Sequence, residues 1–201
     1  AGAALDYATR EAAIRPTDGD GWYGNGYGDV AVGSVDSPAG HFRVWFGLAG
    51  EHEVPDAAEA APPIATLVAG VADQVWGLYV DTLGFRAPLP DDVYHDRPDF
   101  GGDGRVDIYL QQLRDADGYI VTEACQYPPL YGCGGYFVID HTFAWYYASD
   151  EEAVRVLASH ELFHLVQNAY SAGQDGWLTE GSATYLEEVF YPEQDDYEGC
   201  V

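Results

Sequence analysis

The chain has 201 residues, of which 34 are acidic and only 8 are basic, so its formal net charge at pH 7 is −26. This charge repels nucleic-acid phosphates and anionic lipid headgroups, and no run of 18 or more apolar residues could cross a bilayer. We therefore expect neither a nucleic acid nor a membrane as a partner. A hydrophobic content of 47% predicts one domain, or two closely joined subdomains, with a well-buried core.

The first 40 residues predict an N-terminal extension that is largely loop, with one short helix from Ala3 to Ile14. The chain begins with Ala1 and lacks the charged and hydrophobic segments of a signal peptide, which is typical of a processed, secreted protein. We expect residues 41–201 to form the functional domain, within a longer precursor.

The three cysteines also favour an oxidising compartment. Cys125 and Cys133 flank a short Gly/Pro/Tyr-rich stretch that a disulfide could close into a loop. Their spacing matches no common zinc knuckle, so we disfavour them as metal ligands. Cys200 is left over, which predicts a partner outside this chain or in a segment missing from it.

The middle of the chain predicts strands around one long helix. The residues suited to strands are 41–47, 105–110, 119–122 and 135–140, and residues 105–110 alternate as a half-buried strand should. A helix is expected from about Ile64, after two prolines, to Leu83, with Gly84 as its cap.

Asp99, Asp103 and Asp107 lie at four-residue intervals among glycines that permit tight turns. This resembles part of a calcium loop but lacks the bidentate Glu that closes one. The segment could bind Ca²⁺ or could be a plain Asp/Gly turn that leads into a strand.

A second helix begins with the capping box Ser149 to Glu152 and is predicted to continue to about Tyr170. It carries His160-Glu161-Leu162-Phe163-His164, the H-E-x-x-H pattern. Two imidazoles four residues apart project from one helix face and can converge on one ion, while Glu161 lies about 100° around the helix, within reach of a metal-bound water.

The residues around this motif are mostly apolar, which predicts a buried helix. A buried His-Glu-His group is costly to desolvate without partners, and a zinc ion with its water supplies them. The alternative interpretation is a pair of core histidines satisfied by hydrogen bonds alone.

Catalytic zinc needs a third protein ligand and one open position. Residues 177–188 have helical spacing, and Glu180 falls in the first turn of that expected helix, where the helix dipole favours a carboxylate. A returning antiparallel helix could aim Glu180 at the two histidines.

The motif from His160 to His164, followed by Trp177-Leu178-Thr179-Glu180-Gly181-Ser182-Ala183, resembles the paired motif of the gluzincin metallopeptidases, the clan that includes thermolysin. The resemblance covers roughly residues 150–191. Residues 160–170 are also similar to secreted bacterial metallopeptidases related to hyicolysin.

This resemblance implies that His160, His164 and Glu180 bind zinc and that Glu161 activates water. Only fifteen residues separate His164 from Glu180, fewer than in thermolysin-like enzymes, so either the turn is tight or the third ligand differs. Glu187, two helical turns after Glu180, is the alternative ligand. In related enzymes a Tyr or His stabilises the oxyanion, and Tyr185 is our candidate here.

We therefore expect an α+β fold of zincin type, with a small twisted mixed sheet, an active-site helix and a following helix that carries the third ligand. The expected function is that of a monomeric, secreted zinc metalloendopeptidase acting on a protein or peptide substrate. A noncatalytic zinc-stabilised binding or adhesion module, or a zinc hydrolase with a non-peptide substrate, remains an alternative.

Overall fold

The computed structural model describes residues 15–17, 19, 21, 26–90, 103–114, 116–127, 130–143 and 147–193. Its elements in chain order are β1 (Val32–Asp36), β2 (Phe42–Gly47), α2 (Pro63–Trp76), the π-helix η2 (Gly77–Thr82), β3 (Val106–Gln111), β4 (Gly118–Tyr127), β5 (Tyr131–Asp140), α3 (Asp150–Tyr170) and α4 (Gly176–Phe190). The predicted helix over residues 3–14, Asp99 and Cys200 lie outside the described residues.

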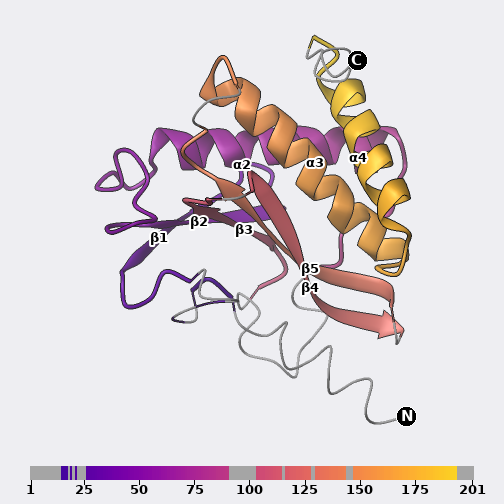
Figure 1. The fold of residues 1–201 in the computed structure, drawn as a ribbon, viewed down its shortest axis with the longest axis horizontal. Coiled ribbons are helices and arrows are strands. Elements are labelled where there is room, and N and C mark those ends of the chain that lie inside the picture. The colour runs from indigo at the N-terminus through magenta and orange to yellow at the C-terminus, as the bar shows by residue number, and fades with distance from the viewer. Residues whose placement is uncertain are drawn as a thin grey trace.

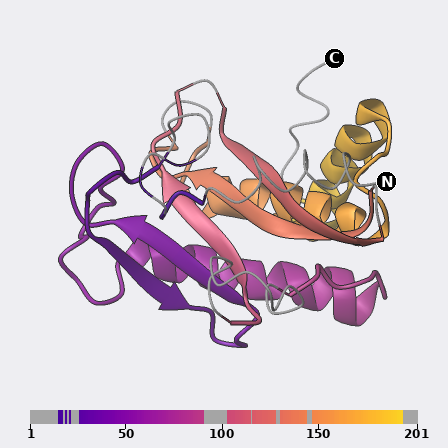
Figure 2. The same ribbon diagram turned by 90° about the horizontal axis from the view of Figure 1, so that it is seen from below.

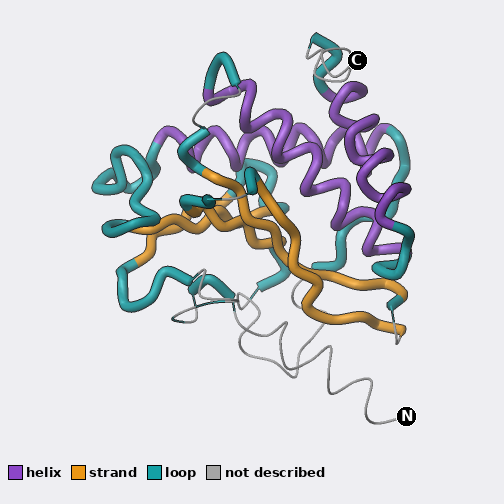
Figure 3. Tube along the Cα trace, viewed as in Figure 1, coloured by secondary structure: helices purple, strands orange, loops and turns teal. Residues whose placement is uncertain are grey.

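One five-stranded sheet, in the order β1-β2-β3-β5-β4, forms the centre of the molecule. β2, β3 and β5 run parallel, while β1 and β4 are antiparallel edge strands, which confirms the predicted mixed sheet. The helices lie on one face of the sheet (Figures 1 and 3). β1 lies inside the segment expected to be mostly loop, so the sheet begins earlier in the chain than the sequence indicated.

β4 and β5 form a hairpin longer than predicted, because the strands continue on both sides of Cys125 and Cys133 almost to the turn. These two cysteines are directly opposite each other in the register and form a disulfide, as expected. The covalent bond therefore fixes the outer end of the hairpin rather than closing an irregular loop.

The predicted long helix is confirmed as α2 followed by η2, with Gly84 at a φ of 74° just beyond it. Among the described residues, Pro63–Thr82 is the one helical stretch long and apolar enough to span a membrane by composition. Seven residues of α2 are buried in the core shared with the sheet and α3, and a core helix meets the same criterion.

The main core lies between the sheet and the helices. Val106, Ile108 and Leu110 of β3 point into it, together with residues from β2, β5, α2 and α3. A smaller cluster that includes Tyr27, Tyr109 and Tyr136 covers part of the opposite face of the sheet, which is nearest the viewer in Figure 2. All six residues of β3 are therefore buried, not half of them as the alternation predicted.

Arg15 is buried against this opposite face of the sheet, with only 1% of its surface exposed. Its Nε and Nη2 donate to the two carboxylate oxygens of Glu123 at 2.6 and 2.7 Å, and its Nη1 pairs with Asp107. Trp45 Nε1 also donates to Asp107, at 2.8 Å. These partners explain why an acidic side chain is tolerated in a central strand.

The same contacts bear on the calcium hypothesis. Asp103 pairs with Arg43 and Arg105, at 2.8 and 2.7 Å, while Asp107 pairs with Arg15. Both carboxylates are thus paired with arginines, which favours the interpretation as a plain turn that leads into β3. Within the described part of the chain these residues form no group that could hold a metal ion.

Candidate metal centre

α3 begins where the capping box predicted. The Ser149 hydroxyl accepts a hydrogen bond from the Glu152 backbone N–H at 3.2 Å, and the Glu152 carboxylate accepts one from the Ala148 N–H at 2.9 Å. The Glu side chain thus reaches one residue further back than in the usual reciprocal pair. From this cap the helix continues for 21 residues and is buried along most of its length.

His160 and His164 point the same way from α3, and their Nε2 atoms lie 2.9 Å apart. Glu180 Oε2 lies 3.3 Å from His160 Nε2 and 3.5 Å from His164 Nε2. This is the one group of at least three His, Cys, Asp or Glu side chains in the described parts of the chain that could hold a metal ion. The three residues proposed from the sequence are therefore brought together.

The short connection between the helices is sufficient to place Glu180. α3 ends at Tyr170 and α4 begins at Gly176, and α4 lies against α3 (Figure 1). Glu180, the fifth residue of α4, thereby reaches the histidines. The Gln174 side chain donates to the carbonyls of Gln167 and Ser171, which closes the turn. Fifteen intervening residues are enough because the turn between the helices is tight.

Hydrogen bonds to the outer nitrogens of both imidazoles set their tautomers. Gln167 Nε2 donates to Thr179 O and Ser182 Oγ, so its Oε1 is the acceptor that faces His164 Nδ1 at 2.9 Å. His160 Nδ1 contacts the Glu187 carboxylate, which is also an acceptor. Both Nδ1 atoms then donate, so in the neutral imidazoles each Nε2 carries a lone pair.

Two acceptor lone pairs and a carboxylate oxygen therefore face one another within 3.5 Å. Such an arrangement is repulsive unless a cation, either a metal ion or a proton on one imidazole, lies among the three atoms. Zinc bonds of about 2.0–2.2 Å at tetrahedral angles put ligand atoms roughly 3.3–3.6 Å apart. The distances from Glu180 Oε2 to the two Nε2 atoms, 3.3 and 3.5 Å, are in this range, and the 2.9 Å between the two Nε2 atoms is shorter by about 0.4 Å. The residues present therefore fit a metal ion of this kind.

Glu187, the alternative third ligand, has a different position. Its carboxylate contacts His160 Nδ1, on the side of the ring away from Nε2, and its side chain is 12% exposed. Carboxylates that hold the outer nitrogen of a metal-binding histidine orient the ring and increase its basicity. This contact fits an orienting residue, and the geometry favours Glu180 as the ligand.

The environments of the two imidazoles differ. Burial lowers the pKa of His160, but the hydrogen bond to Glu187 and the nearby carboxylates outweigh it and raise that pKa above its ordinary value. Burial lowers the pKa of His164, whose hydrogen-bonding partner Gln167 is neutral. The acidic surroundings are thus concentrated around His160.

Glu161 is 6% exposed, and its Oε2 has no hydrogen-bond partner among the described residues. Burial raises the pKa of this carboxyl to about 7. Such an unsatisfied, buried acid is costly, and it is expected at sites where the group acts in chemistry. Glu161 lies next to the first metal-ligand candidate on the side that faces the sheet.

Gly118, the first residue of the edge strand β4, makes room for Glu161. A Cβ atom at this position would lie only 2.7 Å from Glu161 Oε1. With any other residue at this position, the strand or the Glu161 side chain would have to shift.

Tyr185 is not brought into this group. It is 65% exposed, and five residues after Glu180 it projects about 140° around α4, whereas Glu187 returns to nearly the same face as Glu180. Sequence reasoning missed Gln167 and Gly118. The contact of Gly118 in β4 with Glu161 in α3 joins two distant segments and leaves no local signal. Gln167 follows His164 by three residues, which is the one clue to a side-chain contact.

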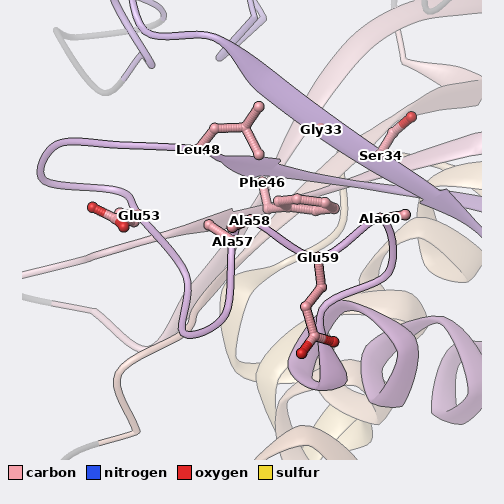
Figure 4. A pocket seen from close by; sticks show the side chains of 9 residues that line it. All are labelled: Gly33, Ser34, Phe46, Leu48, Glu53, Ala57, Ala58, Glu59 and Ala60. Carbon is pink, nitrogen blue, oxygen red and sulfur yellow. The ribbon is translucent and has the colours of Figure 1, made fainter.

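A separate pocket of about 360 Å³ lies beside the edge strand β1, with Phe46 and Leu48 among its walls (Figure 4). The carboxylates of Glu53 and Glu59 at this pocket point in different directions (Figure 4). It contains no histidine, and its acids do not converge, so it does not compete with the α3–α4 site as a metal centre.

Comparisons with protein-family models, curated proteins and solved structures gave no match. The chemistry of this site is therefore inferred from the geometry of the described residues alone.

Proposed function

We propose that this chain is a secreted zinc-dependent endopeptidase, with His160, His164 and Glu180 as metal ligands and Glu161 as general base. The observation that carries this proposal is the convergence of two imidazole nitrogens and one carboxylate oxygen beside a buried glutamate whose Oε2 has no hydrogen-bond partner among the described residues. A structural zinc site would favour four protein ligands and has no use for such a base.

A zinc ion held here would lower the pKa of a coordinated water and polarise the scissile carbonyl. The Glu161 carboxylate accepts the proton from water and later returns it to the leaving amine. Burial keeps this carboxylate from being solvated, and the missing partner at Oε2 leaves an acceptor for the proton. Glu187 and Gln167 hold the two imidazoles with both Nε2 atoms directed at one point.

The substrate proposed is an extended peptide beside β4. β4 is one of the two antiparallel edge strands, and no described strand pairs with its outer edge, so that edge can pair with another extended chain. Its first residue, Gly118, approaches Glu161, which brings a peptide paired with this edge close to the general base. Main-chain pairing of this kind selects an unfolded or flexible substrate.

We include residues 15–40 in the proposed catalytic domain, because β1 pairs with β2 and Arg15 forms ion pairs with buried acids of β3 and β4. The Cys125–Cys133 disulfide supports a secreted location, since such bonds persist in oxidising compartments. Three converging side chains leave a fourth coordination position open, which argues against the alternative of a noncatalytic zinc module.

The test uses Glu161→Gln, which keeps the size of the side chain but removes its basicity. We expect this variant to bind one equivalent of zinc, measured by elemental analysis, and to lose at least a hundredfold in hydrolysis of unfolded casein, because general-base catalysis contributes about 10²–10⁴. Glu188→Gln, elsewhere on the surface of α4, is the matched control. Retained activity in the Glu161 variant would refute the mechanism.

A further inference from the structure

A second pocket, of about 400 Å³, lies between the outer end of the β4–β5 hairpin, the C-terminal end of α3 and the segment after η2. Its apolar walls include Ala87, Leu89 and Ala169. The rings of Tyr127, Tyr131 and Tyr170 also line it, and these three residues are 68%, 57% and 39% exposed. This size is within the usual range for small-molecule sites.

The charge of this pocket is opposite to that of the protein. The chain has 34 acidic residues, yet the described residues that line the pocket include no Asp or Glu, and Arg86 is the one charged residue among them. The pocket beside β1 and another near the start of α3 are both lined by glutamates. An anion would therefore be less strongly repelled here than at those two pockets.

Arg86 also differs from the other described arginines. Arg15, Arg43, Arg105, Arg114 and Arg155 each form an ion pair with a carboxylate. Within the described residues, Arg86 forms none. Nothing in that part of the molecule neutralises its charge.

Arg86 is held in place by Tyr170. Its guanidinium carbon lies 4.7 Å from the centre of the Tyr170 ring, and its backbone N–H donates to the Tyr170 hydroxyl at 3.0 Å. A guanidinium stacked on a ring uses its flat face, so the N–H donors around its edge remain available for a bidentate contact with a carboxylate. The stack also reduces the side-chain entropy that binding would cost.

We propose that this pocket binds an apolar or aromatic residue with a free carboxylate, such as the C-terminal residue of a peptide. Arg86 pairs with the carboxylate, and the tyrosine rings and apolar walls contact the side chain. Ala169 and Tyr170 follow His164 by five and six residues, which is about 8–9 Å along α3, so this site is distinct from the metal centre. It does not depend on the proposed peptidase activity.

The test compares N-acetyl-phenylalanine with N-acetyl-phenylalanine amide, which has the same ring but no charge. We expect saturable binding of the acid, measured by NMR titration, and at least tenfold weaker binding of the amide. Arg86→Ala should weaken acid binding at least tenfold. Arg114→Ala, which removes the same charge at a distant exposed ion pair, should change it less than twofold.

A further titration separates this pocket from the metal centre. It is repeated after dialysis against EDTA, because a carboxylate held only by zinc would then no longer bind. Equal binding of acid and amide, no saturable binding of either, loss of binding with EDTA, or unchanged binding by Arg86→Ala would each overturn the proposal. The comparison of acid with amide uses the unaltered protein, so it holds even if an Arg86 variant folds poorly.

Discussion

At the scale of single residues, the metal centre depends on which nitrogen of each imidazole is free. Glu187 and Gln167 both accept from Nδ1, and that leaves the two Nε2 atoms to face Glu180. Gln167 also donates to the carbonyl of Thr179, one residue before Glu180. The Gln167 side chain thus orients His164 and also bonds to the start of α4, which carries Glu180.

This division of roles predicts different results for the two glutamates. Glu180→Ala should lose zinc binding by at least a hundredfold, because a direct ligand is removed. Glu187→Ala should weaken it about 10–100-fold, the usual effect of removing an outer partner of a ligating histidine. Competition with a calibrated zinc chelator measures both, with Glu188→Ala as the control. Loss of zinc in the Glu187 variant alone would reverse the assignment.

At the scale of elements, the site depends on how closely the edge strand approaches α3. α3 brings the two histidines and Glu161, α4 brings Glu180 and Glu187, and β4 meets Glu161 at Gly118. Asn168, further along α3, donates to Thr122 of β4 at 2.9 Å and fixes the same two elements a second time. The position of the strand relative to the helix is therefore set at two points.

Gly118→Ala tests that approach. The added methyl would lie 2.7 Å from Glu161 Oε1, so either the strand or the carboxylate must shift. We expect hydrolysis to fall at least tenfold while zinc content stays at one equivalent, since no ligand contacts this glycine. Gly70→Ala in α2 is the control, because its Cβ meets no atom within 4 Å and alanine favours a helix. Unchanged hydrolysis by Gly118→Ala would show that catalysis does not depend on the close contact between β4 and Glu161.

At the scale of the whole molecule, the segment before the sheet is part of the fold. Arg15 lies 108 residues from Glu123 and 92 from Asp107 in the chain, yet it pairs with both beneath the sheet. Breaking a buried pair by removing one partner leaves uncompensated charge and typically costs about 3–5 kcal/mol. With two acids and one base in this cluster, the loss of Arg15 leaves both carboxylates without this partner.

Arg15→Ala should therefore lower the free energy of unfolding by about 3 kcal/mol or more, or roughly 6–12 °C in Tm for a chain of this size. Arg114→Ala removes an exposed ion pair and should cost less than about 1 kcal/mol. Calorimetry of the two variants measures the difference. Equal melting temperatures would mean that the N-terminal segment does not anchor the sheet.

The sequence by itself determined the features that arise from local periodicity and capping. The start of α3 at Ser149, the shared face of His160 and His164, and the helix that carries Glu180 all follow from spacing along one helix. The disulfide also followed, since only eight positions separate Cys125 from Cys133. In each of these cases the interacting residues are close in sequence or share an element, so the pattern contains the contact.

Only the tertiary structure decided the contacts between distant segments. Nothing local indicated that Arg15 would cover Asp107, so β3 was expected to be half-buried and Asp107 seemed available for calcium. The choice between Glu180 and Glu187 depended on how α4 packs on α3, because both residues lie on nearly the same helix face. Spacing places a side chain on a face, but the packing of the neighbouring element decides which atom it meets.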